Sequence, residues 1–109
     1  MKLGYVKIYR QLQDHWLYHE KPFCATAAWI DLITRANHKS IKIRFDREVI
    51  PLQRGQFITS TVKLAEQWGW SRTKVTNFLE LLEKDGMIIK ESDHRKTALT
   101  ICNYTYWQE

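Results

Sequence analysis

Apolar residues in the first third of the chain recur at helical spacing. Residues 6–18 place Ile8, Leu12 and Trp16 on one approximate face, beside Tyr9, and predict a first helix. Lys21-Pro22 ends the helical pattern, because a proline disfavours helical geometry in the residue before it. Residues 25–36 predict a second helix, and its apolar positions repeat with the helical period: Ala28, Trp29, Leu32, Ile33 and Ala36.

The spacing of apolar residues then changes from the helical period to every second residue. Residues 41–45 alternate apolar side chains with Lys42 and Arg44, which predicts a strand with one basic face. A tight turn at 46–47 and a second strand at 48–52 complete a hairpin, in which Pro51 favours an edge position. A further turn at 54–55 precedes a short strand at 56–59.

Residues 61–86 predict two helices separated by a glycine turn. The first is short, stops at Gly69-Trp70, and has an apolar side formed by Val62, Leu64, Ala65 and Trp68. Ser71 is a suitable N-cap for the second, because its hydroxyl satisfies free backbone amides. That second helix stops at Gly86, which tolerates a positive φ, and its apolar stripe consists of Val75, Phe78, Leu79 and Leu82.

A second hairpin follows at once, with strands at 87–90 and 98–103 around a polar turn at 92–96. Leu99 and Ile101 share one face of its return strand. Helix, turn, helix and hairpin in this order are typical of a winged helix. We therefore predict an α+β fold, a winged helix-turn-helix with an additional N-terminal helical pair and β-hairpin. We expect residues 1–109 to form a single winged-helix domain, with helices and basic hairpin in 1–60, helix-turn-helix and wing in 61–104, and a tail in 105–109.

Composition narrows the class of protein. The 109 residues have an ordinary globular balance, with 44 % hydrophobic and 27 % charged residues, which argues against a disordered or fibrous chain. We expect a soluble, cytoplasmic protein without membrane association, because neither a membrane span nor a signal peptide is visible. Cys24 and Cys102 have no metal spacing and are expected to be buried small apolar residues in a reduced protein.

The positive charge is unevenly distributed. Seventeen basic and twelve acidic residues give a net charge of +5, and residues 39–60 alone contribute +3 from five bases and two acids. A basic surface is compatible with a polyanionic partner but does not identify one. Within the first hairpin, Lys42, Arg44 and Arg47 either extend a nucleic-acid footprint through extra phosphate contacts or keep an edge strand from aggregating.

The helix after Ser71 carries the candidate DNA-binding residues. The outward positions of its first two turns are polar or basic: Arg72, Thr73, Lys74, Thr76 and Asn77. Its last turns carry Glu80, Glu83 and Asp85, so its charges oppose the helix dipole. Bases beside free N-terminal amides favour an anion, and recognition helices contact bases with their N-terminal residues, Arg to guanine and Asn to adenine. The alternative is an ordinary solvated face.

The second hairpin offers further cations near that helix. Lys90, Arg95 and Lys96 are expected to contact phosphates, although a polar turn without a ligand has the same composition.

Short segments over nearly the whole chain carry a family resemblance through their order and spacing. They are Val6-Lys7-Ile8-Tyr9-Arg10, Ala28-Trp29-Ile30-Asp31-Leu32, Ala36-Asn37-His38-Lys39, Arg54-Gly55-Gln56-Phe57-Ile58-Thr59-Ser60, Leu64-Ala65, Trp68-Gly69-Trp70-Ser71-Arg72, Phe78-Leu79, Leu82-Glu83, Asp85-Gly86-Met87-Ile88 and Thr100-Ile101-Cys102-Asn103-Tyr104. Together they resemble the amino-terminal winged-helix domain of DnaD-like replication proteins (replisome organisers) of bacteriophages and prophages.

This resemblance implies binding to double-stranded DNA at a phage replication origin, self-association and recruitment of replication proteins. It also implies that the five outward residues after Ser71 face DNA. Family members usually continue into a further region, so the resemblance implies either a fragment or a stand-alone protein.

Two other functions stay open beside replication. The first is that of a small phage or prophage transcription regulator. The second is that of a winged helix redirected to bind or inhibit a host protein. An enzyme is not expected, nor a cofactor or metal, because no catalytic or ligand motif stands out and Asp31 is expected on the solvated side of its helix. Tyr104, Tyr106 and Trp107 predict a weak homodimer contact, unless the tail folds back onto the first helix.

Overall fold

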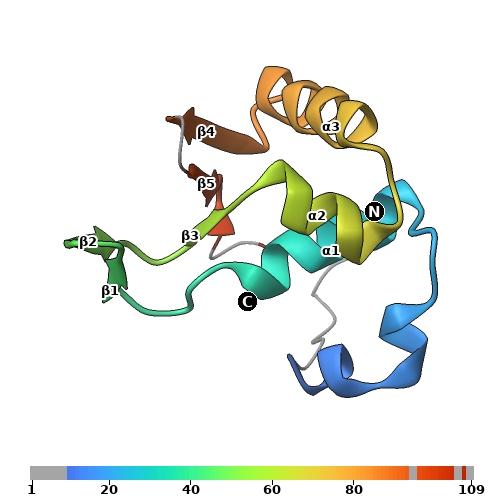
Figure 1. The fold of residues 1–109 in the computed structure, drawn as a ribbon, viewed down its shortest axis with the longest axis horizontal. Helices are drawn as coiled ribbons and strands as arrows, with labels where there is room; N and C mark the ends of the chain where they lie inside the picture. The colour runs from blue at the N-terminus through green and yellow to red at the C-terminus, as the bar shows by residue number, and fades with distance from the viewer. Residues whose placement is uncertain (1–9, 94–95, 105–106, 108–109) are drawn as a thin grey trace, which may run out of the picture.

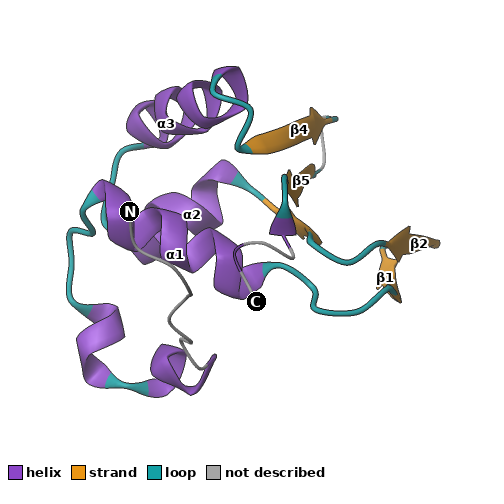
Figure 2. Cartoon of the chain, turned by 180° about the vertical axis from the view of Figure 1, so that it is seen from behind, coloured by secondary structure: helices purple, strands orange, loops and turns teal. Residues whose placement is uncertain are grey.

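The computed structural model describes residues 10–93, 96–104 and 107. Within these residues the fold is α+β, as expected, with three α-helices and two small antiparallel sheets. The helices are α1 (Ala25–Arg35), α2 (Thr61–Trp68) and α3 (Arg72–Lys84). Figures 1 and 2 show α1 and α2 packed together at the centre, with α3 and the sheets around them.

The expected helix over residues 6–18 is wrong where the structure describes it, and residues 6–9 lie outside that part. Two short 3₁₀ helices, η1 (Arg10–Asp14) and η2 (Trp16–His19), are separated by His15, whose Nδ1 accepts a hydrogen bond from the Leu17 amide at 3.1 Å. Trp16 is 68 % exposed, whereas Tyr18 is buried. Helical periodicity gave the wrong prediction because this segment is held by contacts of single side chains with α1. Its described part has no continuous apolar face that packs as a helix would.

The first hairpin matches its expected bounds. β1 (Ile41–Phe45) pairs with β2 (Glu48–Leu52), and Asp46 takes a left-handed conformation at the turn, with φ 57°. Cross-strand pairing puts Ile41, Ile43 and Phe45 on one face, whereas Lys42 and Arg44 share the other face with Pro51 and Val49. Figures 1 and 2 place this hairpin at one end of the molecule, away from the α2–α3 turn.

The second sheet joins distant parts of the chain. β3 (Gln56–Thr59) and β4 (Ile88–Ser92) both pair antiparallel with β5 (Thr97–Ile101), giving the order β3-β5-β4. The expected strands of the second hairpin were displaced by one or two residues, since β4 begins at Ile88 and continues to Ser92. Gly86, with φ 77°, ends α3 and allows Met87 N–H to bond the Leu82 carbonyl at 2.9 Å.

The core lies where the helices meet the three-stranded sheet. Val75, Leu79 and Leu82 of the expected stripe are buried, and Phe78 is half-buried at its edge. The remaining fully buried large apolar residues come from every layer: Leu32, Leu64, Trp68, Ile88 and Leu99. Val62 is an exception to the predicted α2 face, because it is 42 % exposed.

Candidate nucleic-acid interface

The turn between α2 and α3 fixes the direction in which α3 leaves the core. Gly69 ends α2 with φ 71°, and its amide bonds the Ala65 carbonyl at 2.9 Å. Ser71 caps α3 as predicted, because its hydroxyl accepts the Lys74 amide at 3.1 Å. Trp70, which lies between Gly69 and Ser71 in the sequence, is buried and donates its indole N–H to the Phe23 carbonyl at 2.9 Å.

The first two turns of α3 present the predicted polar side chains away from the core. Arg72, Thr73, Lys74 and Asn77 are exposed, and Thr76 is half-buried. Val75, on the opposite side of the same turn, is fully buried. Helical spacing places Thr73 and Asn77 opposite Val75, with Arg72 and Thr76 on one flank and Lys74 on the other. The acidic residues of α3 lie in its last turns.

Lys74 has a defined position on this face. Its ammonium lies 4.3 Å from the centroid of the Trp70 ring, a cation–π contact. Trp70 is itself held edge-to-face against Trp68 and Phe78, at centroid distances of 5.0 and 5.3 Å. A cation on a packed aromatic support loses less rotamer freedom when it pairs with an anion, so Lys74 is pre-organised.

A hollow of about 300 Å³ separates this part of α3 from the start of α1. Its lining is mostly apolar and is formed by Phe23, Cys24, Ala25, Trp70, Lys74, Asn77, Phe78 and Leu81. Leu81 is 63 % exposed, four residues after Asn77 on α3. This hollow was not predicted, although an apolar Leu81 outside the stripe of α3 was a signal in the sequence.

The cations of the second hairpin are less available than predicted. Lys90 is half-buried and pairs across the strands with buried Leu99, so it lies on the inner face of the sheet. The Lys96 side chain is only 16 % exposed, bonds Asp93 Oδ2 at 3.0 Å and lies 5.0 Å from the centroid of Phe45. Arg95 lies outside the described residues. The Lys96–Phe45 contact also joins the two hairpins.

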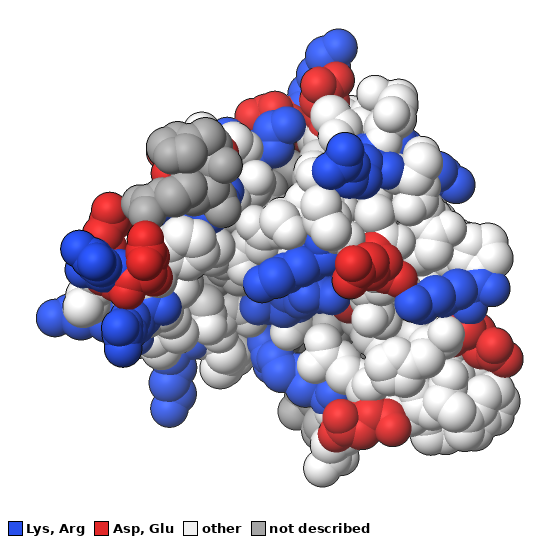
Figure 3. All heavy atoms as spheres, in the orientation of Figure 1, with Lys and Arg blue, Asp and Glu red and all other residues white. Residues whose placement is uncertain are grey.

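The basic residues of the first hairpin do not join those of α3. Lys42, Arg44 and Arg47 are exposed, and Arg44 Nε bonds the Asp46 carbonyl at 3.2 Å. Figure 3 shows blue and red side chains mixed at the hairpin end, rather than one continuous basic patch over the visible face. This hairpin is therefore a separate group of cations, distant from the first turns of α3.

Asp31 corrects a prediction, because its side chain is fully buried rather than solvated. Oδ1 accepts a hydrogen bond from the Tyr18 hydroxyl, and Oδ2 accepts from Trp68 Nε1 and Arg35 Nε, both at 2.7 Å. Burial, followed by the hydrogen bond to Asp31, raises the pKa of Tyr18 to about 12. This network joins η2, α1 and α2, and α3 packs against α2.

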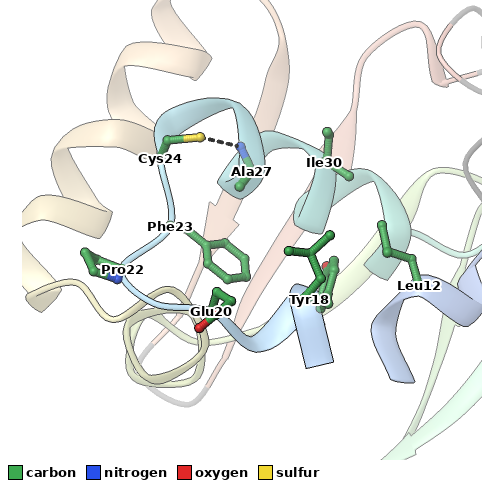
Figure 4. Close-up of a pocket in the computed structure, with 9 residues that line it drawn as sticks. Leu12, Tyr18, Glu20, Pro22, Phe23, Cys24, Ala27 and Ile30 are labelled. Atoms are coloured by element: carbon green, nitrogen blue, oxygen red, sulfur yellow. Dashed lines mark hydrogen bonds between the residues drawn. The ribbon is translucent and has the colours of Figure 1, made fainter. Parts of the chain in front are cut away.

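Cys24 also departs from prediction, since it is exposed at the N-cap of α1, while Cys102 is half-buried. The Cys24 Sγ accepts a hydrogen bond from the Ala27 amide at 3.4 Å. Figure 4 shows Cys24 near Phe23 and Ala27 at a second hollow, of about 250 Å³, which Tyr18 lines farther along. Cys24 thus has a local structural role in starting α1.

The tail aromatics that the structure describes, Tyr104 and Trp107, both pack on other parts of the chain, so the basis given for a homodimer is wrong in part. Tyr104 is buried, and its hydroxyl accepts a hydrogen bond from Arg10 Nη2 at 2.8 Å. Trp107 packs edge-to-face on Trp29 of α1 at 5.3 Å and is 40 % exposed. Tyr106 lies outside the described residues. The described part of the tail folds back on the helical body.

Comparisons with models of known families, with curated proteins and with solved structures found no match. No helix in the described ranges has the length and apolar character needed to cross a membrane. The same residues include no group of three or more His, Cys, Asp or Glu side chains arranged to hold a metal ion.

Proposed function

We propose that this chain is a winged-helix DNA-binding module that places α3 in the major groove. Its element order supports the proposal: α1, β3, α2 and α3 are followed by the β4–β5 hairpin, and β3 pairs with β5. In this proposal α3 is the recognition helix, β4–β5 is the wing, and β1–β2 is an added hairpin.

The observation that carries the proposal is the polar face at the start of α3. Arg72, Thr73, Lys74 and Asn77 are exposed together beside the capped N-terminus, and the opposite side of the helix is in the core. Cations at this end oppose the helix dipole, at a cost of a few tenths of a kcal/mol each in an exposed helix. An anionic ligand at the same end offsets that cost.

Each residue then has a distinct role. Arg72 matches the two acceptors of guanine, and Asn77 matches the donor and acceptor of adenine. Lys74 neutralises a phosphate, with Thr73 and Thr76 as short hydrogen-bonding side chains at the same surface. Arg95 is a secondary phosphate contact in this proposal, whereas Lys90 on the inner face of the sheet is not. Lys42, Arg44 and Arg47 extend the footprint only where DNA reaches the added hairpin.

The biological setting that we favour is initiation of phage or prophage replication in the cytoplasm. The resemblance of segments such as Trp68-Gly69-Trp70-Ser71-Arg72 to DnaD-like replication proteins supports it. A promoter-binding regulator uses the same contacts, so the target DNA separates the two functions. A weak homodimer on DNA remains part of the proposal through that resemblance, and not through Tyr104, which is buried.

Selection of bound duplexes from fragments of the parent genome tests this function. We expect enrichment of a sequence within a replication region, with affinity that falls as salt is raised, because phosphate contacts release counterions. Enrichment of promoter regions instead would favour a transcription regulator. Binding without any sequence preference would contradict recognition by α3 and favour a protein ligand.

A further inference from the structure

The hollow between α3 and the start of α1 combines several kinds of chemistry. Phe23, Phe78 and Leu81 give it an apolar wall, and Lys74 and Asn77 line it as well. Its volume of about 300 Å³ lies at the lower end of the range for ligand sites, about 300–1,000 Å³. A ligand here needs an apolar edge, a hydrogen-bonding group and a negative charge close together.

We propose that this hollow receives the methyl-bearing edge of a thymine in the major groove, at or next to the adenine that Asn77 contacts. The inference rests on the proposed DNA-binding function and deepens it, because it names the base pair that the module selects. The preferred site accordingly contains an A·T pair opposite the second turn of α3.

The lining favours thymine over the other bases. Only thymine presents a methyl group in the major groove, and apolar side chains are its usual contacts. A polar edge of guanine or cytosine set directly against Phe78 and Leu81 would lose water without gaining a partner from these two side chains. Leu81 is 63 % exposed, so a methyl group placed against it buries apolar surface on both partners.

Charge at the hollow favours a nucleic acid as the occupant. The Lys74 ammonium, held 4.3 Å from the Trp70 ring centroid, matches a phosphate that accompanies the base. The Asn77 amide lies one helical turn further along the same wall and supplies the hydrogen bonds to adenine. An apolar peptide would satisfy the wall but would leave the Asn77 amide and the cation without their matching groups.

Two substitutions on α1 separate the hollow from its surroundings. Ala25 and Thr26 are both exposed in the first turn of α1, but only Ala25 lines the hollow. Ala25→Glu and Thr26→Glu add the same charge at a helix end that tolerates it. We expect Ala25→Glu to weaken binding of the selected duplex at least tenfold more than Thr26→Glu, with unchanged melting of both proteins.

A change in the DNA alone provides the second arm. Deoxyuridine is substituted for each thymine of the selected duplex in turn, which removes one methyl group. We expect one position to lose about fourfold in affinity, the value of one buried methyl-sized group. In Leu81→Ala the same substitution should have a much smaller effect, because the wall that contacts the methyl group is gone.

The outcomes distinguish the two proposals. Specific binding with equal affinities for the two glutamate variants overturns the inference and leaves the hollow to a protein ligand. An Ala25 effect without any thymine effect also overturns it, because another part of the DNA then fills the hollow. Absence of any specific duplex binding overturns the proposed DNA-binding function as well.

Discussion

At the scale of the residue, Asp31 links the N-terminal segment to the helical body. Its carboxylate receives the Tyr18 hydroxyl, the Trp68 indole and the Arg35 guanidinium, so one buried group joins three elements. The sequence contained a usable signal, since Asp31 lies three residues after Ala28 and directly before Leu32, both fully buried. The helical phase therefore placed Asp31 inward, but the donors that stabilise it come from distant segments.

Tyr18 makes the network sensitive to alkaline pH. Its pKa is raised to about 12, above an ordinary value of 10, so the neutral phenol stabilises the folded state fully below pH 10. This contribution is lost as pH rises from 10 through 12. We expect the free energy of unfolding of wild type to exceed that of Tyr18→Phe by about 1–2 kcal/mol at pH 8. This difference should be smaller by about 1 kcal/mol at pH 11.

Urea unfolding of both proteins at the two pH values measures this difference. Contributions from all other groups are the same in both proteins and cancel in the comparison. A difference between wild type and Tyr18→Phe that stays constant from pH 8 to pH 11 would show that Tyr18 is not protected in the folded state.

At the scale of the element, the two glycines that flank α3 have different constraints. Both take positive φ values, 71° at Gly69 and 77° at Gly86. A Cβ at Gly69 would lie 3.1 Å from Lys21 Cβ and 3.3 Å from Pro22 Cα, whereas a Cβ at Gly86 meets nothing within 4 Å. Backbone strain thus acts at both positions, and close packing acts only at Gly69.

We expect Gly86→Ala to lower the free energy of unfolding by about 1–2 kcal/mol, the cost of the left-handed conformation alone. Gly69→Ala should cost more, because the segment at Lys21-Pro22 must also move. Chemical denaturation of the two variants provides the measurement. Equal losses would mean that the N-terminal segment yields freely and does not constrain the α2–α3 turn.

The same elements show how far sequence reasoning reaches. Local signals were sufficient from Ser60 to Gly86, because caps, glycines and apolar stripe act within a few residues of each other. They failed in residues 10–19, where single contacts with α1 determine the structure. They also did not locate the hollow, since Phe23 and Ala25 are about fifty residues from Asn77 in sequence and only the fold brings them together.

At the scale of the whole molecule, the two hairpins contact each other through Lys96 and Phe45, at 5.0 Å. This contact and the bond to Asp93 occupy the Lys96 ammonium, whereas Lys74 is exposed on α3. We expect Lys74→Ala to reduce the slope of log affinity against log salt by about 0.9, the value for one phosphate contact. Lys96→Ala should change it much less.

Binding isotherms from low to moderate salt give both slopes. An equal reduction for the two variants would mean that Lys96 leaves Asp93 when DNA binds, and that the β4–β5 hairpin contributes as much to phosphate contact as α3.

The central claim is that the first two turns of α3 read DNA bases. The most direct test is the affinity of Arg72→Ala and Asn77→Ala for the selected duplex, beside Lys84→Ala, which removes an exposed cation from the other end of the same helix. We expect a loss of about 1–3 kcal/mol for the first two, with relaxed preference at one base pair each, and little change for Lys84→Ala. Equal affinities for all three variants and the parent would contradict the claim.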